Sequence, residues 1–180
     1  MTSLATEELG RSDAVVAEKA SILIGAPLQV LAPVTGGGNN RVYRAEMKDG
    51  RQFVVKRYPQ QKEDRRDRLG AEYDALVFME EEGFGERVPT AVAVDREMGL
   101  AVYGWIEGTA LSAANPESRS PADISSAIEF LEKLFEVRHS ANAKSLVSAS
   151  ECCLSGASLC EQIDQRRQRI DEIAESHPAL

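Results

Sequence analysis

Apolar residues recur at helical spacing near the start of the chain, and the spacing then changes. Ser12 and Asp13 are candidate N-caps for a helix that runs to about Ile24, and Gly25 and Pro27 end it. Beyond this helix the apolar residues form short runs rich in β-branched side chains, each bounded by turn residues. The change in period predicts one helix followed by a β-sheet.

Five runs are predicted to form strands, and a helix interrupts them. The runs cover residues 28–34, 41–47, 51–58, 91–94 and 100–106. Asp49–Gly50 separates the second run from the third and is a strong hairpin signal, so the first three strands should form an antiparallel meander. A helix is predicted over residues 66–82, because Leu69 and Leu76 lie on one helical face and Gly83 is a suitable C-cap.

Past Gly108 the pattern is helical only. A polar loop covers residues 115–121, and amphipathic helices are predicted over 123–137 and 151–174. Three strands, a helix, two strands and then helices predict an α+β lobe followed by the start of a helical lobe. The expected divisions are an N-terminal helix over residues 1–27, a sheet-containing lobe over 28–107, and helices of a second, incomplete lobe over 108–180.

Composition excludes several classes of protein. A hydrophobic content of 43% is sufficient for a packed core. A net charge of −8 argues against a nucleic-acid partner, because proteins that bind nucleic acid normally carry a clustered basic face. The first residues are acidic and polar, unlike a secretory signal peptide, and no apolar run approaches the ~20 residues that span a bilayer. We expect a cytoplasmic protein with no membrane partner.

The cysteines support the same compartment. Cys152, Cys153 and Cys160 are odd in number and do not follow a zinc-binding spacing. We therefore predict reduced, buried thiols on a helix.

A glycine-rich segment, Thr35 to Asn40, lies between the first two predicted strands. A flexible hairpin would explain it without any ligand. Alternatively, glycines let backbone amides approach phosphate oxygens closely, with no Cβ in the way. A P-loop needs Gly-Lys-Ser/Thr opening a helix, and the dinucleotide fingerprint needs a glycine where Arg41 stands. The remaining phosphate motif is the kinase type of glycine loop, which covers a nucleotide from above.

Such a loop predicts a lysine on the third strand and a glutamate on the next helix. Lys56 lies in the third strand on the same face as Val54, and Glu72 lies on the flank of the apolar face of the helix. A lysine near a strand end can also be an ordinary surface residue. However, a carboxylate at Glu72 would be costly to bury without a cation. We therefore predict a Lys56–Glu72 ion pair that holds the lysine against the α- and β-phosphates of ATP.

The fifth predicted strand is apolar and breaks at Glu107–Gly108. It could be a buried strand that ends in a simple turn. In a kinase, the same connection joins two lobes and offers backbone groups to adenine. The glycine segment, Lys56, Glu72 and this strand occur in the order that a kinase requires, so the combined match is more specific than any one element.

Over about residues 28–110 the chain resembles the aminoglycoside phosphotransferase-like branch of the protein-kinase-like fold, which contains small-molecule kinases. The matching segments are Thr35–Arg44, Phe53–Lys56, Leu69–Tyr73 and Val102–Gly108. The resemblance implies an ATP site with Gly36, Gly37, Gly38, Asn39 and Asn40 over the phosphates, Val42 and Val54 as the adenine roof, Lys56 and Glu72 at the phosphates, Tyr103 at the back, and Gly104 and Ile106 as backbone contacts to the base. Gly104 replaces a glutamate that is frequent in the family, which a backbone contact tolerates.

The resemblance also implies a catalytic aspartate in a His-Gly-Asp type of loop and a metal-binding aspartate in an Ile-Asp type of strand. Neither His139 nor His177 is followed two residues later by aspartate. Asp164 and Asp171 each follow an isoleucine, but they lie in a charged stretch at helical period, which is typical of a solvated helix face. We assign no catalytic or metal-binding residue within this chain, and we expect the Mg²⁺ ligands beyond residue 180 of a longer kinase.

The leading hypothesis is an α+β, protein-kinase-like N-lobe, with a five-stranded antiparallel sheet plus a helix, followed by the beginning of a helical C-lobe. The parent enzyme would transfer the γ-phosphoryl group of ATP, with Mg²⁺, to a hydroxyl of a small molecule. This chain would be a fragment that lacks the catalytic loop. The alternative is a complete short protein that binds nucleotide without catalysis, or that serves as a protein-interaction module.

Overall fold

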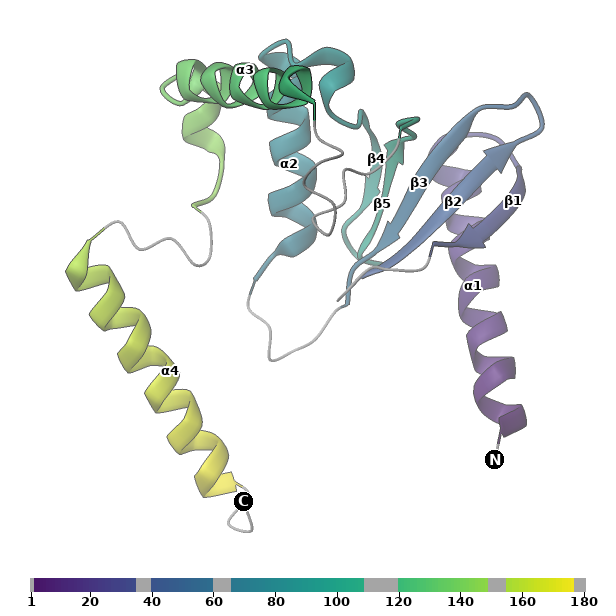
Figure 1. Ribbon diagram of the computed structural model, residues 1–180. Coiled ribbons are helices and arrows are strands. Elements are labelled where there is room, and N and C mark those ends of the chain that lie inside the picture. The colour runs from purple at the N-terminus through teal and green to yellow at the C-terminus, as the bar shows by residue number, and fades with distance from the viewer. Residues whose placement is uncertain (1, 35–39, 60–65, 109–119, 149–154, 177–180) are drawn as a thin grey trace. The chain divides into compact units, whose positions relative to one another are not determined.

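The computed structural model describes residues 2–34, 40–59, 66–108, 120–148 and 155–176. Contacts divide the chain into two compact units, residues 1–147 and residues 148–180, which we describe separately (Figure 1).

The described part of the first unit contains one five-stranded antiparallel sheet (Figure 1). Its strands are β1 (Leu28–Pro33), β2 (Arg41–Met47), β3 (Gln52–Arg57), β4 (Ala91–Asp95) and β5 (Leu100–Gly104). Their order across the sheet is β1-β2-β3-β5-β4, so β5 lies between β3 and β4. The predicted α+β class and the predicted meander of the first three strands are confirmed.

The turn between β2 and β3 sets the register of the sheet. Gly50 has a φ of 84°, which favours glycine, and its N–H donates to the carbonyl of Met47 at 3.0 Å. The Asp49 carboxylate accepts from the backbone N–H of Arg51 at 3.1 Å. The hairpin signal at Asp49–Gly50 therefore corresponds to a tight turn, after which Glu46 lies opposite Gln52.

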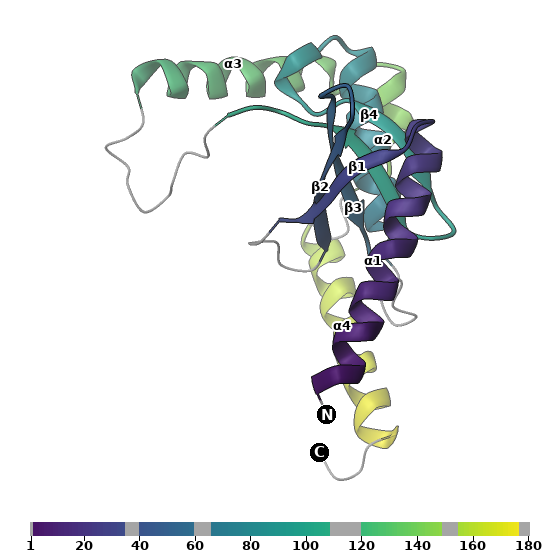
Figure 2. The same cartoon turned by 90° about the vertical axis from the view of Figure 1, so that its right-hand side faces the viewer.

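The C-terminal half of helix α1 (Thr2–Ile24) packs on one face of the sheet (Figure 2). Val16 and Ala20 of this helix are buried against Tyr43, Val55 and Val102 from three strands. Burial of this apolar surface is the main force that attaches α1 to the sheet.

The predicted start of the first helix is wrong. The helix begins at Thr2, so Ser12 and Asp13 lie inside it and do not cap it. The Asp13 carboxylate instead accepts a 2.7 Å hydrogen bond from the hydroxyl of Tyr43 and lies 4.0 Å from Arg41. Asp13, which the sequence predicts to be an N-cap, therefore makes a tertiary contact with β2 instead.

Helix α2 (Arg68–Glu81) lies on the opposite side of the sheet from α1 (Figure 1). Asp67 is its N-cap and accepts from the N–H of Gly70 at 2.7 Å. At the other end Gly83 has a φ of 74°, as expected for the residue that ends a helix. The short helix η1 (Gly85–Arg87) then leads into β4.

Helix α3 (Pro121–Val137) begins with Ser120 as N-cap and a reciprocal capping box with Asp123. The rings of Phe84 and Phe130 are 5.2 Å apart, edge to face, and Lys133 donates to the carbonyl of Gly83. These contacts attach α3 to the segment that follows α2. The short helix η3 (Asn142–Ser145) follows.

The second unit contains helix α4 (Gly156–Ser176). Cys160 on this helix is a free thiol and is exposed, so the prediction of a buried thiol is wrong at this position. Leu159 and Ile163, the apolar residues nearest to it on the helix, are exposed as well, so no described residue of this unit forms a core around the thiol. Cys152 and Cys153 lie outside the described residues.

None of the helices in the described part of the chain combines the length and the apolar character needed to cross a membrane.

Replacing Leu100 by alanine should destabilise the first unit by about 2–5 kcal/mol, because the substitution leaves a cavity in the core between α1 and the sheet. Leu100 is 1% exposed. Val30→Ala is the matched control, since Val30 is 43% exposed on β1 and should cost less than about 1 kcal/mol. Urea unfolding followed by circular dichroism measures both. Equal losses in the two variants would contradict the assigned core.

Candidate functional site

Four predicted site residues of the strands, Val42, Val54, Lys56 and Tyr103, lie on the face of the sheet that packs on α2. β2 pairs with β3 so that Val42 lies opposite Lys56, and β3 pairs with β5 so that Val54 lies opposite Tyr103. Alternate residues of a strand share a face. Val54 and Tyr103 pack with Leu69 of α2, which identifies this face.

Lys56 and Glu72 make the predicted contact. The ammonium of Lys56 donates to both carboxylate oxygens of Glu72, at 2.8 Å to Oε1 and 2.6 Å to Oε2. The two side chains are 20% and 38% exposed, so the pair is sheltered and still accessible from solvent. Since Glu72 occupies only part of the donor capacity of the ammonium, Lys56 can also donate to a ligand.

Tyr58, which the sequence pattern did not single out, completes this cluster. The ammonium of Lys56 lies 5.2 Å from the centroid of the Tyr58 ring, within cation–π range. The hydroxyl groups of Tyr58 and Tyr103 share a 2.8 Å hydrogen bond, in which either can donate. Tyr58 follows Lys56 by two residues, so the alternation of a strand was the signal that could have placed it on the same face.

The two hydroxyl groups are buried and neutral. Burial raises the pKa of Tyr58 above its ordinary value, and the hydrogen bond to Tyr103 and the Glu72 carboxylate raise it further. Burial also raises the pKa of Tyr103 to about 12. The pair therefore contributes hydrogen bonding behind the Lys56–Glu72 ion pair and no charge near neutral pH.

The predicted adenine-contacting backbone begins where β5 ends. The N–H of Gly104 donates to the carbonyl of Thr90 at 2.9 Å, so this N–H is not available to a base. A Cβ at Gly104 would lie 3.4 Å from the Cβ of Thr90, and this close approach favours glycine. Within the described residues the N–H of Ile106 has no hydrogen-bond partner. The carbonyl of Gly104 and the N–H of Ile106 thus remain the candidates.

Only one residue of the predicted glycine loop is described. Asn40, directly before β2, has a buried Oδ1 with no hydrogen-bond partner among the described residues, which is uncommon in folded proteins. Gly36, Gly37, Gly38 and Asn39 lie outside the described residues, so their position over the phosphates stays a prediction.

The acidic residues and histidines outside this face do not form a second centre in the described ranges. Asp164 and Asp171 are exposed on α4, which confirms the solvated helix face, and His139 is exposed just past α3. His177 lies outside the described residues. Among the residues that are described, no three His, Cys, Asp or Glu side chains gather as a metal site would require.

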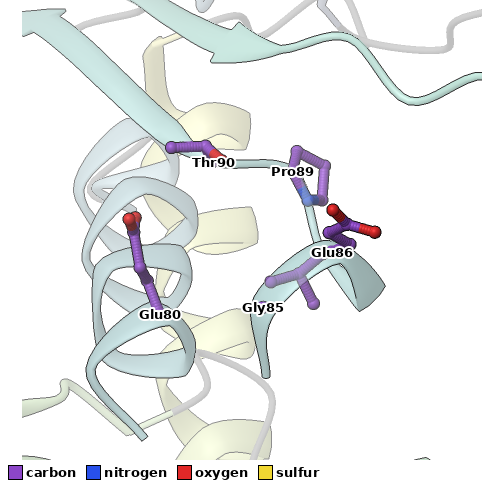
Figure 3. A pocket seen from close by; sticks show the side chains of 6 residues that line it. Glu80, Gly85, Glu86, Pro89 and Thr90 are labelled. Carbon is purple, nitrogen blue, oxygen red and sulfur yellow. The ribbon is translucent and has the colours of Figure 1, made fainter. Parts of the chain in front are cut away.

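A small pocket of about 240 Å³ lies near the end of α2, away from the predicted site (Figure 3). It is lined by Glu80, Gly85, Glu86, Val88, Pro89 and Thr90. Figure 3 shows the Glu80 side chain extending toward Thr90. Among the described residues predicted to bind ATP, none lines this pocket, and Thr90 of its lining contacts one of them, Gly104.

The lysine–glutamate pair between a strand and a helix is the arrangement expected of a kinase-like phosphotransferase. The family model of the phosphotransferase enzyme family matches residues 30–172, which include most of β1, all of β2 to β5, α2, α3 and most of α4. The chain belongs to this family.

Two other comparisons complete this result. No curated protein sequence matches the chain. A crystal structure from Thermobifida fusca, described as a "putative fructosamine-3-kinase", is similar to it, with 22% sequence identity and a TM-score of 0.41. The match covers 54% of this chain and 33% of that one, so the present chain spans about a third of the length of the solved structure.

Removing the Tyr103 hydroxyl should destabilise the protein by about 0.5–1.5 kcal/mol, because Tyr103→Phe removes the buried hydrogen bond to Tyr58 and leaves that hydroxyl with Glu72 alone. Tyr73→Phe is the control, since the ring of Tyr73 packs 6.1 Å from that of Tyr103 in a less buried position. Its hydroxyl has no hydrogen-bond partner among the described residues, and the loss should stay within about 0.5 kcal/mol. Chemical denaturation measures the free energy of unfolding of both variants. A Tyr103→Phe variant as stable as the wild type would contradict the assigned hydrogen bond.

Stability should fall as the pH rises from about 10 to about 12. Below the ordinary tyrosine pKa both the folded and the unfolded chain are protonated, so the stabilisation is complete. Above it, the unfolded chain ionises while Tyr58 and Tyr103 stay neutral in the folded chain, at a cost of about 1.4 kcal/mol per pH unit for each tyrosine. Phenolate absorbance should rise near pH 10 in urea and only at higher pH in the native protein. Coincident titration curves would refute the buried pair.

Proposed function

We propose that this chain holds the nucleotide of an ATP-dependent phosphotransferase that moves the γ-phosphoryl group to a hydroxyl of a small molecule. The observation that supports the proposal most directly is the bidentate contact in which Nζ of Lys56 donates to Oε1 and Oε2 of Glu72, at 2.8 and 2.6 Å. It lies on the face of the sheet that also presents Val42 and Val54. Membership of the phosphotransferase enzyme family supports the reaction class.

Each residue has a distinct role in this proposal. Glu72 orients the Lys56 ammonium, whose remaining donor capacity binds the α- and β-phosphates. Val42 and Val54, both half-buried on that face, contact the adenine ring from above. Tyr103 closes the back of the site, because its hydroxyl is held by Tyr58 and its ring is 3% exposed.

The backbone and the preceding loop complete the nucleotide site. The carbonyl of Gly104 and the N–H of Ile106 bind the edge of the base, and the segment Gly36–Asn40 covers the phosphates. Backbone groups suit adenine because they offer one acceptor and one donor at a fixed spacing.

In the proposed reaction the acceptor oxygen forms a bond to the γ-phosphorus while the bond from that phosphorus to the β-phosphate oxygen breaks, and ADP leaves. Lys56 stabilises charge on the phosphates during this step. The hydroxyl proton passes to a base that we assign to none of the described residues. Mg²⁺ supplies further charge neutralisation when bound, and we assign it no ligands here.

Saturating ATP should raise the melting temperature of the chain, since a ligand at ~100 times its Kd stabilises the folded state by about 2.7 kcal/mol. Lys56→Met should lose most of this shift, because it removes the donor to the phosphates. Lys48→Met is the matched control: Lys48 is exposed in the turn after β2, and the shift should be unchanged. Differential scanning fluorimetry, with each variant referenced to its own ligand-free midpoint, measures the effect.

A comparison with adenosine distinguishes binding of the adenine from binding of the phosphates. Lacking phosphates, it should give a smaller shift than ATP in the wild type and the same shift in Lys56→Met. A full ATP shift in Lys56→Met would refute the assigned lysine. An ATP shift absent from all three proteins would count against nucleotide binding by this chain and favour an interaction module.

A further inference from the structure

The turn between β4 and β5 is anchored to the sheet and to α1. Asp95 accepts from the N–H of Met98 at 2.9 Å within the turn, and Gly99 has a φ of 64°. The carbonyl of Gly99 accepts from the N–H of Tyr58 at 2.8 Å, and Lys19 of α1 lies 3.9 Å from the Asp95 carboxylate. The turn is therefore a rigid support at the end of β3, directly beside the Lys56–Tyr58 segment.

One arginine of this turn connects the support to α2. Nη2 of Arg96 donates to Oδ1 of Asp74 at 2.6 Å, and Nη1 lies 3.7 Å from Oδ2 of Asp67, the N-cap. Gly70 lies beneath this contact. A Cβ there would be 2.1 Å from the Asp67 carboxylate and 2.8 Å from the Arg96 guanidinium, so only glycine leaves room for them.

Glu72 lies on the helical segment between the two aspartates that Arg96 contacts. The apolar contacts of α2 with the sheet, through Leu69 and Leu76, are non-directional and allow small rotations of the helix. A guanidinium bound to two carboxylates almost two turns apart opposes such a rotation, because its donors have a fixed geometry.

We propose that Arg96 is a positioning residue that holds α2 in the orientation in which Glu72 meets Lys56. Arg96 touches neither of these residues and acts through Asp67 and Asp74. We call Arg96 with Asp67 and Asp74 the Arg96 clamp. Its effect on the Lys56–Glu72 contact can be tested by itself, whereas its importance for phosphoryl transfer rests on the proposed function. The contacts are exposed, so their effect is modest and depends on salt.

Acetylation of Lys56 in the absence of nucleotide tests the clamp. Hydrogen bonds to Glu72 shield the Lys56 amine, and Arg96→Gln should raise its rate of acetylation by acetic anhydride by about three-fold relative to Lys48, measured by peptide mass spectrometry. Glu72→Gln gives the upper limit of the rise. Asp74→Asn, which removes the shorter ion pair and leaves the arginine, should give a smaller rise in the same direction.

Arg51→Gln is the matched control, because Arg51 is also exposed and also pairs with an aspartate, Asp49, at 2.8 Å in the β2–β3 turn. Its Lys56 labelling should equal that of the wild type. Unchanged Lys56 labelling in Arg96→Gln would overturn the proposal. A parallel rise at Lys48, Lys56 and Lys133 would also overturn it, since it would assign Arg96 to global stability.

Measurement of ATP affinity distinguishes a failure of the Arg96 proposal from a failure of the proposed nucleotide site. If ATP binds the wild type, Arg96→Gln should weaken the affinity by about three-fold at a temperature where every variant is folded. A changed midpoint of unfolding with an unchanged Kd would reduce Arg96 to a structural residue and overturn the positioning role. Failure of the wild type to bind ATP would refute the proposed function, and the labelling experiment would still decide on the clamp.

Discussion

The site depends on one interaction, the ion pair between the partly sheltered carboxylate of Glu72 and the ammonium of Lys56. Glu72 is carried by a helix that packs on the sheet, and it meets Lys56 from the central strand β3 with both of its oxygens. Because both side chains are partly shielded from solvent, their attraction is screened less than that of a fully exposed ion pair. The ion pair therefore ties the position of α2 to the position of β3, and any ligand of Lys56 binds where both elements are in place.

The two faces of the sheet differ in the polarity of the side chains that they bury. The α1 face is apolar, with Val16 and Val55 almost fully buried, and contains no charged side chain in its buried cluster. The α2 face has a smaller apolar cluster whose border is polar, where the hydroxyl groups of Tyr58 and Tyr103 lie behind the ion pair. A rigid face on one side allows the other to hold polar groups in a defined geometry, which suits a member of a phosphotransferase family.

Local signals predicted the strands, the β2–β3 turn and α2 from sequence, because turn residues and helical periodicity act over a few positions. The Lys56–Glu72 contact was also predictable, since a charged residue on an apolar flank needs an opposite charge. The rest depends on partners distant in sequence: the recruitment of Asp13 by Tyr43, the hydroxyl pair of Tyr58, and the exposure of Cys160. No local pattern distinguishes an aspartate that caps a helix from one that binds a strand.

The most direct test of the nucleotide site is covalent labelling with an adenosine derivative that carries a lysine-reactive sulfonyl fluoride in place of its phosphates. If adenine binds beside Val54 with its 5′ substituent toward the Lys56–Glu72 pair, mass spectrometry of the digested protein should find the label on Lys56. Excess ATP should prevent that modification. Labelling of Lys48 and Lys133 at rates equal to Lys56, unaffected by ATP, would contradict the assignment of this face as a nucleotide site.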